Sequence, residues 1–120
     1  MLSDALFLDL FSPRSQEWQP EANVTETSTQ FRVDVDLPGV SKDMVAVSTD
    51  GGVLSISGER SPPEDTRLRV ESRFGKFRRK FRLPDGVLDQ EIAASHRDGL
   101  LTVMIPKVRA SGARSIQIAD

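Results

Sequence analysis

Apolar and polar residues alternate in the stretch Phe31-Arg32-Val33-Asp34-Val35-Asp36-Leu37-Pro38-Gly39. Successive side chains of a β-strand point to opposite faces, so this alternation predicts a strand with one apolar face on a core and one polar face in water. Pro38-Gly39 is typical of the turn that ends such a strand, because proline lacks the backbone N–H that a central strand needs. The stretch therefore indicates a protein built from half-buried strands.

The same period of two recurs along the rest of the chain. Asp50-Gly51-Gly52 separates two such segments. Glycine tolerates positive φ, so this tripeptide predicts the tight turn of a hairpin. The further expected strands cover residues 45–49, 53–58, 67–73, 77–83, 92–96 and 100–105. About seven to eight short strands at this spacing predict an all-β sandwich.

Composition limits the function classes. The chain has 120 residues, 38% of them hydrophobic, which suffices for one domain. Its net charge is only -2, so no global field attracts nucleic acid or an anionic membrane. Cysteine is absent and His96 is the single histidine, so disulfides and thiolate metal sites are excluded. No apolar run approaches the roughly 20 residues of a spanning helix, and we expect a cytoplasmic protein without membrane insertion.

The segment before the strands has a helical rather than a strand period. Its five large apolar side chains recur at i, i+3 and i+4 spacings, which predicts a short amphipathic helix over residues 1–11. A helix this short is marginal in water by itself, so it needs a surface to bind. That surface is its own domain, a neighbouring subunit or a non-native client. The apolar side chains of this arm are Leu2, Leu6, Phe7, Leu10 and Phe11.

Several specific motifs follow one another along the chain. They are Asp36-Leu37-Pro38-Gly39-Val40, Gly52-Val53-Leu54-Ser55-Ile56-Ser57-Gly58-Glu59-Arg60, Gly75-Lys76-Phe77-Arg78-Arg79-Lys80-Phe81-Arg82-Leu83-Pro84, Ala94, Asp98-Gly99-Leu100-Leu101 and Ile105-Pro106-Lys107. In this order and at these spacings they resemble the α-crystallin domain of the small heat-shock proteins over residues 18–107. Further on, Ile116-Gln117-Ile118 looks like that family's C-terminal anchor motif, I-x-I.

The resemblance implies three parts and a function. Residues 1–17 form an N-terminal arm, residues 18–107 an immunoglobulin-like sandwich of the α-crystallin type, and residues 108–120 a tail with the anchor. It also implies dimers that assemble further through the arms, and ATP-independent capture of unfolding client proteins, a holdase activity that needs no cofactor. The arm before the domain is shorter than is usual for the family, which argues against a large shell.

The anchor has a physical mechanism. A strand that presents Ile116 and Ile118 on one face pairs with an exposed sheet edge while both side chains fill alternate pockets. By resemblance, the receiving groove lies between the strands at 45–49 and 92–96. Its candidate lining residues are Val45, Val47, Ile92 and Ala94. The alternative is that these four are plain core residues and that the tail is disordered.

Arg79 lies on the apolar parity of its strand, between Phe77 and Phe81. A buried guanidinium needs a partner, because its desolvation is costly. In the family, the arginine at this place lies at the subunit contact. The acids Glu64, Asp65 and Glu71 would then reach it from a second chain, and the alternative is an ion pair within one chain.

Other function classes fit the sequence less well. The basic and aromatic run at residues 73–82 superficially resembles an RNA-binding strand, but its glycine pattern differs and Phe77 shares the core parity. Ser95, His96 and Asp98 do not make a hydrolase triad, since adjacent strand residues point to opposite faces. We therefore expect no enzyme, no metal and no nucleic acid. The remaining alternative is an assembly or adaptor module of the same fold without holdase activity.

Overall fold

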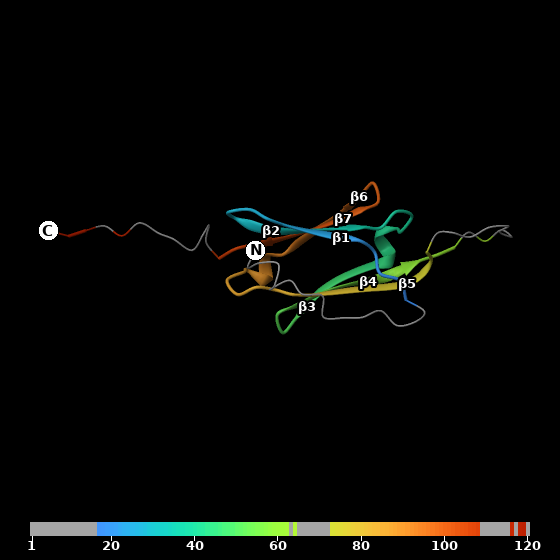
Figure 1. The fold of residues 1–120 in the computed structure, drawn as a ribbon, viewed down its shortest axis with the longest axis horizontal. Coiled ribbons are helices and arrows are strands. Elements are labelled where there is room, and N and C mark those ends of the chain that lie inside the picture. Colours follow the sequence, from blue (N-terminus) through green and yellow to red (C-terminus); the bar gives the residue numbers. More distant parts are fainter. Residues whose placement is uncertain (1–16, 63, 65–72, 109–115, 117, 120) are drawn as a thin grey trace.

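A computed structural model of the chain describes residues 17–62, 64, 73–108, 116, 118 and 119. Within them, two antiparallel sheets lie face to face as two layers (Figure 1). The elements are β1 (Ala22–Glu26), β2 (Gln30–Asp36), η1 (Lys42–Met44), β3 (Val45–Asp50), β4 (Val53–Arg60), β5 (Gly75–Arg82), η2 (Asp89–Glu91), β6 (Ala93–Arg97) and β7 (Leu100–Pro106), where η denotes a 3-10 turn. The predicted all-β sandwich is thereby confirmed, with seven strands in the described residues.

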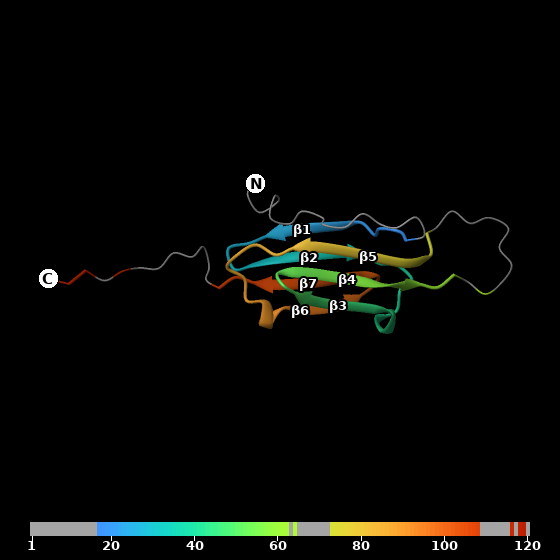
Figure 2. The same ribbon diagram turned by 90° about the horizontal axis from the view of Figure 1, so that it is seen from below.

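The strand order places two edges opposite each other. One sheet has the order β1-β2-β7-β6 and the other β3-β4-β5. Figure 2 shows β3 and β6 along the same side of the sandwich and β1 and β5 along the other. The predicted hairpin at Gly51-Gly52 joins β3 to β4, with Asp50 opposite Val53. The second predicted turn, at Asp98-Gly99, joins β6 to β7.

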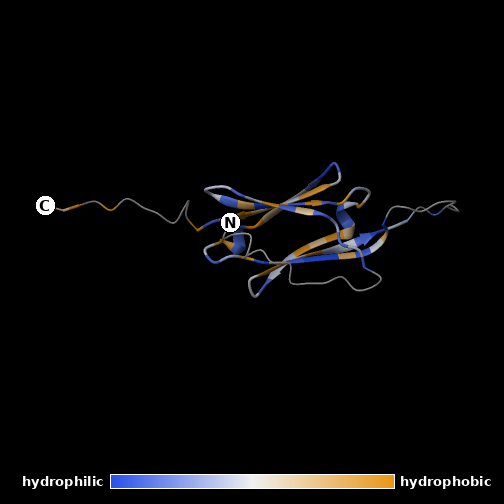
Figure 3. Cartoon of the chain, in the orientation of Figure 1, coloured by the Kyte–Doolittle hydropathy of each residue, from blue (hydrophilic) through white to orange (hydrophobic). Residues whose placement is uncertain are grey.

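The core consists of the apolar parity of each strand. Figure 3 shows apolar and polar residues alternating along the strands of both layers. Thirteen apolar side chains are buried between the sheets, and they include the apolar residues of the opening stretch and of β5. They are Phe31, Val33, Val35, Leu37, Val40, Leu54, Ile56, Phe77, Phe81, Leu83, Leu101, Val103 and Ile105. The period of two therefore identified the inward face correctly.

Close packing at Gly58 and a positive φ at Gly99 explain why glycine occupies these two positions. Gly58 lies on the inward face of β4, and a Cβ placed there would come within 2.6 Å of Cζ of Phe77 and would also clash with the carbonyl oxygen of Met44. The turn residues Asp98 and Gly99 have φ of 53° and 78°. Two positive φ values in a two-residue turn match the right-handed twist of the strands that it joins.

Some expectations differ from the structure or fall outside it. β1 was not predicted from the sequence: it pairs with β2 along its whole length, with Val24 opposite Val33. Its alternation is too short to stand out, so the pairing with β2 defines it. The expected strand at 67–73 and the expected helix at 1–11 lie outside the described residues, apart from Arg73. In the described part of the chain, no helix is long and apolar enough to cross a membrane.

Candidate functional site

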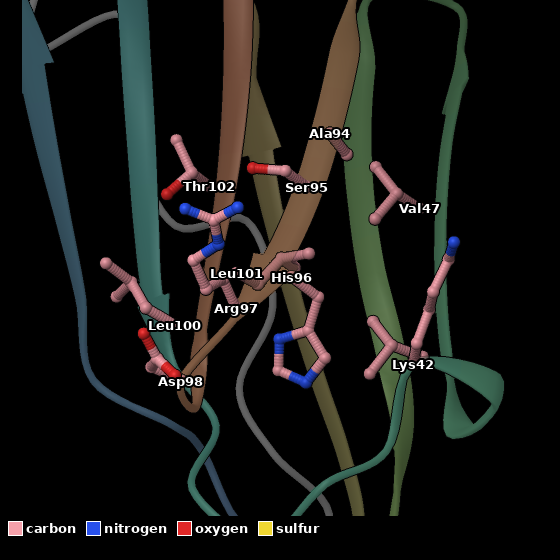
Figure 4. A pocket seen from close by; sticks show the side chains of 11 residues that line it. Lys42, Val47, Ala94, Ser95, His96, Arg97, Asp98, Leu100, Leu101 and Thr102 are labelled. Atoms are coloured by element: carbon pink, nitrogen blue, oxygen red, sulfur yellow. The ribbon is translucent and has the colours of Figure 1, made fainter.

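A groove of about 860 Å³ runs between the edge strands β3 and β6. Both strands end their sheets, so the groove is open along the side of the sandwich. Its lining mixes apolar side chains, such as Val47, Ala94 and Leu101, with polar and charged ones (Figure 4). The lining residues are Lys42, Val45, Val47, Ala94, Ser95, His96, Arg97, Asp98, Leu100, Leu101 and Thr102.

The apolar walls come from alternate residues of the two edge strands. Val45 and Val47 are half-buried on the inward face of β3. Ala94 and His96 share the inward parity of β6, because they lie opposite the buried Val103 and Leu101 of β7. Figure 4 places Val47 beside Ala94 across the groove. Of the four predicted lining residues, Val45, Val47 and Ala94 line the groove, while Ile92 packs against the core cluster just before β6.

The backbone of β3 directs some of its polar groups away from β4, along the edge that borders the groove. Leu83 donates its N–H to the carbonyl oxygen of Gly52 at 2.8 Å, so these two residues form a hydrogen-bonded pair of the β4–β5 ladder. This pair fixes which residues of β4 form hydrogen bonds with β5 and which form them with β3. Hydrogen-bonded and non-hydrogen-bonded positions alternate along antiparallel pairs. With the observed register, the N–H and C=O of Val47 and Thr49 therefore point away from β4. An incoming strand would meet these groups.

The backbone of β6 has the same property. Leu37 donates its N–H to the carbonyl oxygen of Gly99 at 2.8 Å, so these two residues form a hydrogen-bonded pair that continues the β2–β7 ladder. This pair fixes which residues of β7 form hydrogen bonds with β2 and which form them with β6. The register then directs the N–H and C=O of Ala94 and His96 away from β7. Val47, Ala94 and His96 thus combine outward backbone groups with side chains that line the groove. Strand addition and side-chain insertion are thus offered by the same residues.

His96 also lines the groove, a position that the sequence analysis did not assign to it. Its Nε2 lies 2.6 Å from the carbonyl oxygen of Val40, which ties β6 to the segment just before η1. The parity with Ala94 was a signal available in the sequence, but the contact with Val40 was not. Ser95 has the opposite parity and lies opposite Thr102, so Ser95 and His96 do not face each other.

The described tail residues Ile116 and Ile118 are not among the residues that line this groove. They are 77% and 90% exposed. Large aliphatic side chains at this exposure contribute nothing to the core of their own domain. They remain available for another surface.

Arg79 is held within its own chain by a backbone acceptor. Its Nη1 donates to the carbonyl oxygen of Pro20 at 2.7 Å, and its guanidinium lies 4.9 Å from the ring centre of Phe81. This hydrogen bond is to a main-chain oxygen of the segment before β1. Of the acids predicted to meet Arg79, Glu64 is exposed, while Asp65 and Glu71 lie outside the described residues, as do the five apolar residues of the N-terminal arm.

The described residues give little support to nucleic-acid binding or metal binding. Phe77 and Phe81 are 2% and 3% exposed, so neither ring is available to stack on a base. Phe77 packs instead against Trp18, with ring centres 5.4 Å apart. Among the described residues, no group of three or more His, Cys, Asp or Glu side chains is placed to hold a metal ion.

Comparison with known proteins agrees with this architecture. The model of the Hsp20/alpha crystallin family matches residues 23–119. The chain is 43% identical to the 17.4 kDa class I heat shock protein of Arabidopsis thaliana over 84% of this chain and 64% of that protein. It is 36% identical to the 17.5 kDa class I heat shock protein of Glycine max over 97% and 89% of the two chains.

Solved structures show the same fold. Heat shock protein 16.0 from Schizosaccharomyces pombe superposes with a TM-score of 0.80 and 35% identity, over 98% of this chain and 89% of that chain. A small heat-shock protein from Xylella fastidiosa, described as having a distinct high order structure, gives 0.73 and 37%, over 87% and 99%.

The chain belongs to the Hsp20/alpha crystallin family, the small heat shock proteins. The resemblance stated from the motifs is therefore confirmed. This family consists of non-enzymatic chaperones that are typically oligomeric. The chain spans 64% of the length of its Rickettsia felis and 17.4 kDa Arabidopsis relatives and 60% of a rice relative.

Proposed function

We propose that this chain is an ATP-independent holdase of the cytoplasm, which binds unfolding proteins and prevents their aggregation. The observation that carries the proposal is the open groove between β3 and β6, where apolar side chains and outward backbone groups lie together. Unfolding proteins expose extended apolar segments, and such a segment satisfies both features by strand addition. The family membership supports the same reading.

The groove also suits the chain's own tail. Ile116 and Ile118 are separated by one residue, so they share one face of an extended segment and match the spacing of Val45 and Val47 along β3. We propose that this anchor of one subunit occupies the groove of another and links dimers into larger homo-oligomers. Tail and client then compete for one surface, and release of the tail exposes the groove.

The remaining sites complete the proposal. Arg79, which contacts the segment before β1 through Pro20, belongs to the dimer contact together with Glu64, Asp65 and Glu71. The apolar arm, with Leu2, Leu6, Phe7, Leu10 and Phe11, holds clients or a neighbouring subunit. Burying two or three such side chains contributes several kcal/mol, at about 1.5 to 3 each. The division into 1–17, 18–107 and 108–120 follows these roles.

Light scattering of a heat-sensitive client protein tests the holdase. The client is heated with and without the chain, in the absence of nucleotide, at ratios from equimolar to several-fold excess of the chain. We expect scattering to fall as the chain is added. Bovine serum albumin at equal mass controls for non-specific protection. Full aggregation at several-fold excess would contradict the proposal and favour the adaptor module without holdase activity.

A further inference from the structure

A short strap, defined as residues 17–20, precedes β1 and lies against the edge strand β5. The N–H of Trp18 donates to the carbonyl oxygen of Lys76 in β5 at 3.0 Å. Just after the strap, the carbonyl oxygen of Glu21 accepts from the N–H of Asp36 in β2 at 2.9 Å. The strap therefore crosses from one sheet to the other, and in Figure 1 it runs in blue from the layer of β5 to that of β1.

Trp18 anchors the strap through its indole ring. The ring N–H donates to the carbonyl oxygen of Gly75 at 3.0 Å. The ring packs on Phe77, with centres 5.4 Å apart, and the guanidinium of Arg60 lies 5.7 Å from its centre. A hydrogen bond, an aromatic contact and a cation thus meet one half-buried ring. This part of the β5 edge is therefore suited to an aromatic side chain with a polar group.

Charge adds a second requirement beside the aromatic one. Nη2 of Arg78 donates to Oε1 of Glu17 at 3.0 Å. The outward side chains of β5, which alternate with two buried phenylalanines, are all basic. They are Lys76, Arg78, Lys80 and Arg82. A segment that lies along this edge is therefore favoured when it is acidic.

The strap has a limited hold on β5. Its described pairing with β5 is one parallel bridge, between Trp18 and Phe77. Oε2 of Glu17 is buried and has no hydrogen-bond partner among the described residues, which costs free energy in the closed state. Pro20, by contrast, is fully buried, and its carbonyl oxygen accepts from Arg79 at 2.7 Å. The part of the strap before Pro20 is therefore the part that releases most readily.

We propose that the edge of β5 is a second client-binding surface, which takes an extended segment with an aromatic residue next to an acidic one. The strap is its resident occupant, and the part before Pro20 dissociates on heating. This inference rests on the proposed holdase function. The register with β4 directs the N–H and C=O of Arg78, Lys80 and Arg82 away from β4. A client segment adds to this edge as a strand, with its aromatic residue in the place of Trp18.

Peptide binding tests the surface, because Trp18 is the only tryptophan of the chain. The receiver is the full chain with W18A, which keeps the buried core because Trp18 only packs against it. The probe is a peptide of residues 15–21, whose tryptophan is then the only one present. We expect its emission to shift to the blue on binding. An unshifted emission at saturating receiver would overturn the surface.

A charge exchange tests the acidic requirement. We expect the peptide with E17K to bind the W18A receiver about two- to fivefold more weakly than the natural peptide, the range of an exposed ion pair. In a receiver with W18A and R78E, the E17K peptide should bind more tightly than the natural one. R82E is the matched control, because it changes the charge of β5 equally at a position without a described contact to the strap. A preference that reverses equally with R82E would overturn the role of Arg78.

Heating the intact chain tests the release without the W18A variant. We expect the emission of Trp18 to shift to the red at a lower temperature than the loss of the far-ultraviolet sheet signal. E17Q should lower the first temperature. E26Q is the matched control, since it removes the ion pair with Lys107 at 2.8 Å elsewhere in the domain, and it should leave the first temperature unchanged. Coincident transitions in the natural chain would overturn the release.

Competition links the surface to clients. The natural peptide in excess should raise the light scattering of a heated client that the W18A chain protects, and the same peptide with W18A should not. Unchanged scattering with the natural peptide would overturn the use of this surface by clients and leave the holdase intact. A natural chain that protects no client would refute the holdase itself, while peptide binding and Trp18 release still test the edge of β5.

Discussion

Replacing Ile116 and Ile118 together by Ala is expected to shift the protein from higher oligomers towards dimers. Both side chains are exposed in the described chain, at 77% and 90%, so their truncation removes no contact from the sandwich. In the groove, each would bury an aliphatic side chain worth about 1.5 to 3 kcal/mol. The double variant therefore loses about 3 to 6 kcal/mol per tail, or about two to four powers of ten in affinity. The remaining strand hydrogen bonds, at about 0.5 to 1.5 kcal/mol net each, do not replace this loss.

Light scattering behind a sizing column measures the mass, and thermal unfolding measures the stability of the domain. We expect a lower mass with an unchanged melting temperature, because the anchor lies outside the core. Gln117→Ala is the matched control, since Gln117 has the opposite parity and should leave the mass unchanged. V47D, in the groove, should reproduce the loss of mass from the receiving side. An unchanged mass for the double variant would refute the reasoning and leave the N-terminal arm as the element of assembly.

Two further outcomes are expected. Deletion of residues 1–11 should weaken client protection more than dimer formation, because the sandwich keeps its core and its subunit contact. Sedimentation measures dimer formation and client light scattering measures protection. A monomeric variant that still protects the client fully would contradict this expectation. Gly58→Ala should destabilise the domain by about 1 to 3 kcal/mol, as overpacking does, because its Cβ would lie 2.6 Å from Cζ of Phe77. Denaturant unfolding measures this loss, with Gly51→Ala as a control at a turn with open space, where only the positive φ of 58° is strained.

The sequence predicted the strands with a long alternation and missed the one without it. β2 and β5 were predicted because apolar residues recur at every second position in and just after each strand, four in the first and three around Arg79 in the second, and these apolar side chains are buried as expected. β1 has one central apolar residue, Val24, flanked by Asn23 and Thr25, so its local pattern is weak. Its strand conformation comes from pairing with β2, which no local pattern reports.

Polar residues show the same division. Asp34 has the solvent parity of β2, yet it is only 8% exposed. It accepts hydrogen bonds from Oγ1 of Thr102 at 2.8 Å and from Nε of Arg32 at 3.0 Å, so its burial is compensated. Thr102 stands opposite Asp34 only because β7 pairs with β2 in one register. The position of Asp34 on the polar side of its strand could be predicted from the sequence, but its hydrogen-bond partner Thr102 could not.

The sequence by itself determined the positions of the turns, the inward face of the long strands, and the spacing of the anchor in the tail. These are properties of neighbouring residues, because the period of a strand and the φ requirement of a turn are local. Local patterns did not report that β3 and β6 lie opposite each other or that His96 contacts the carbonyl oxygen of Val40 beside their groove, and the tertiary structure decided both. Strand order and register arise from contacts between residues far apart in the chain, and the groove exists only where two such edges meet.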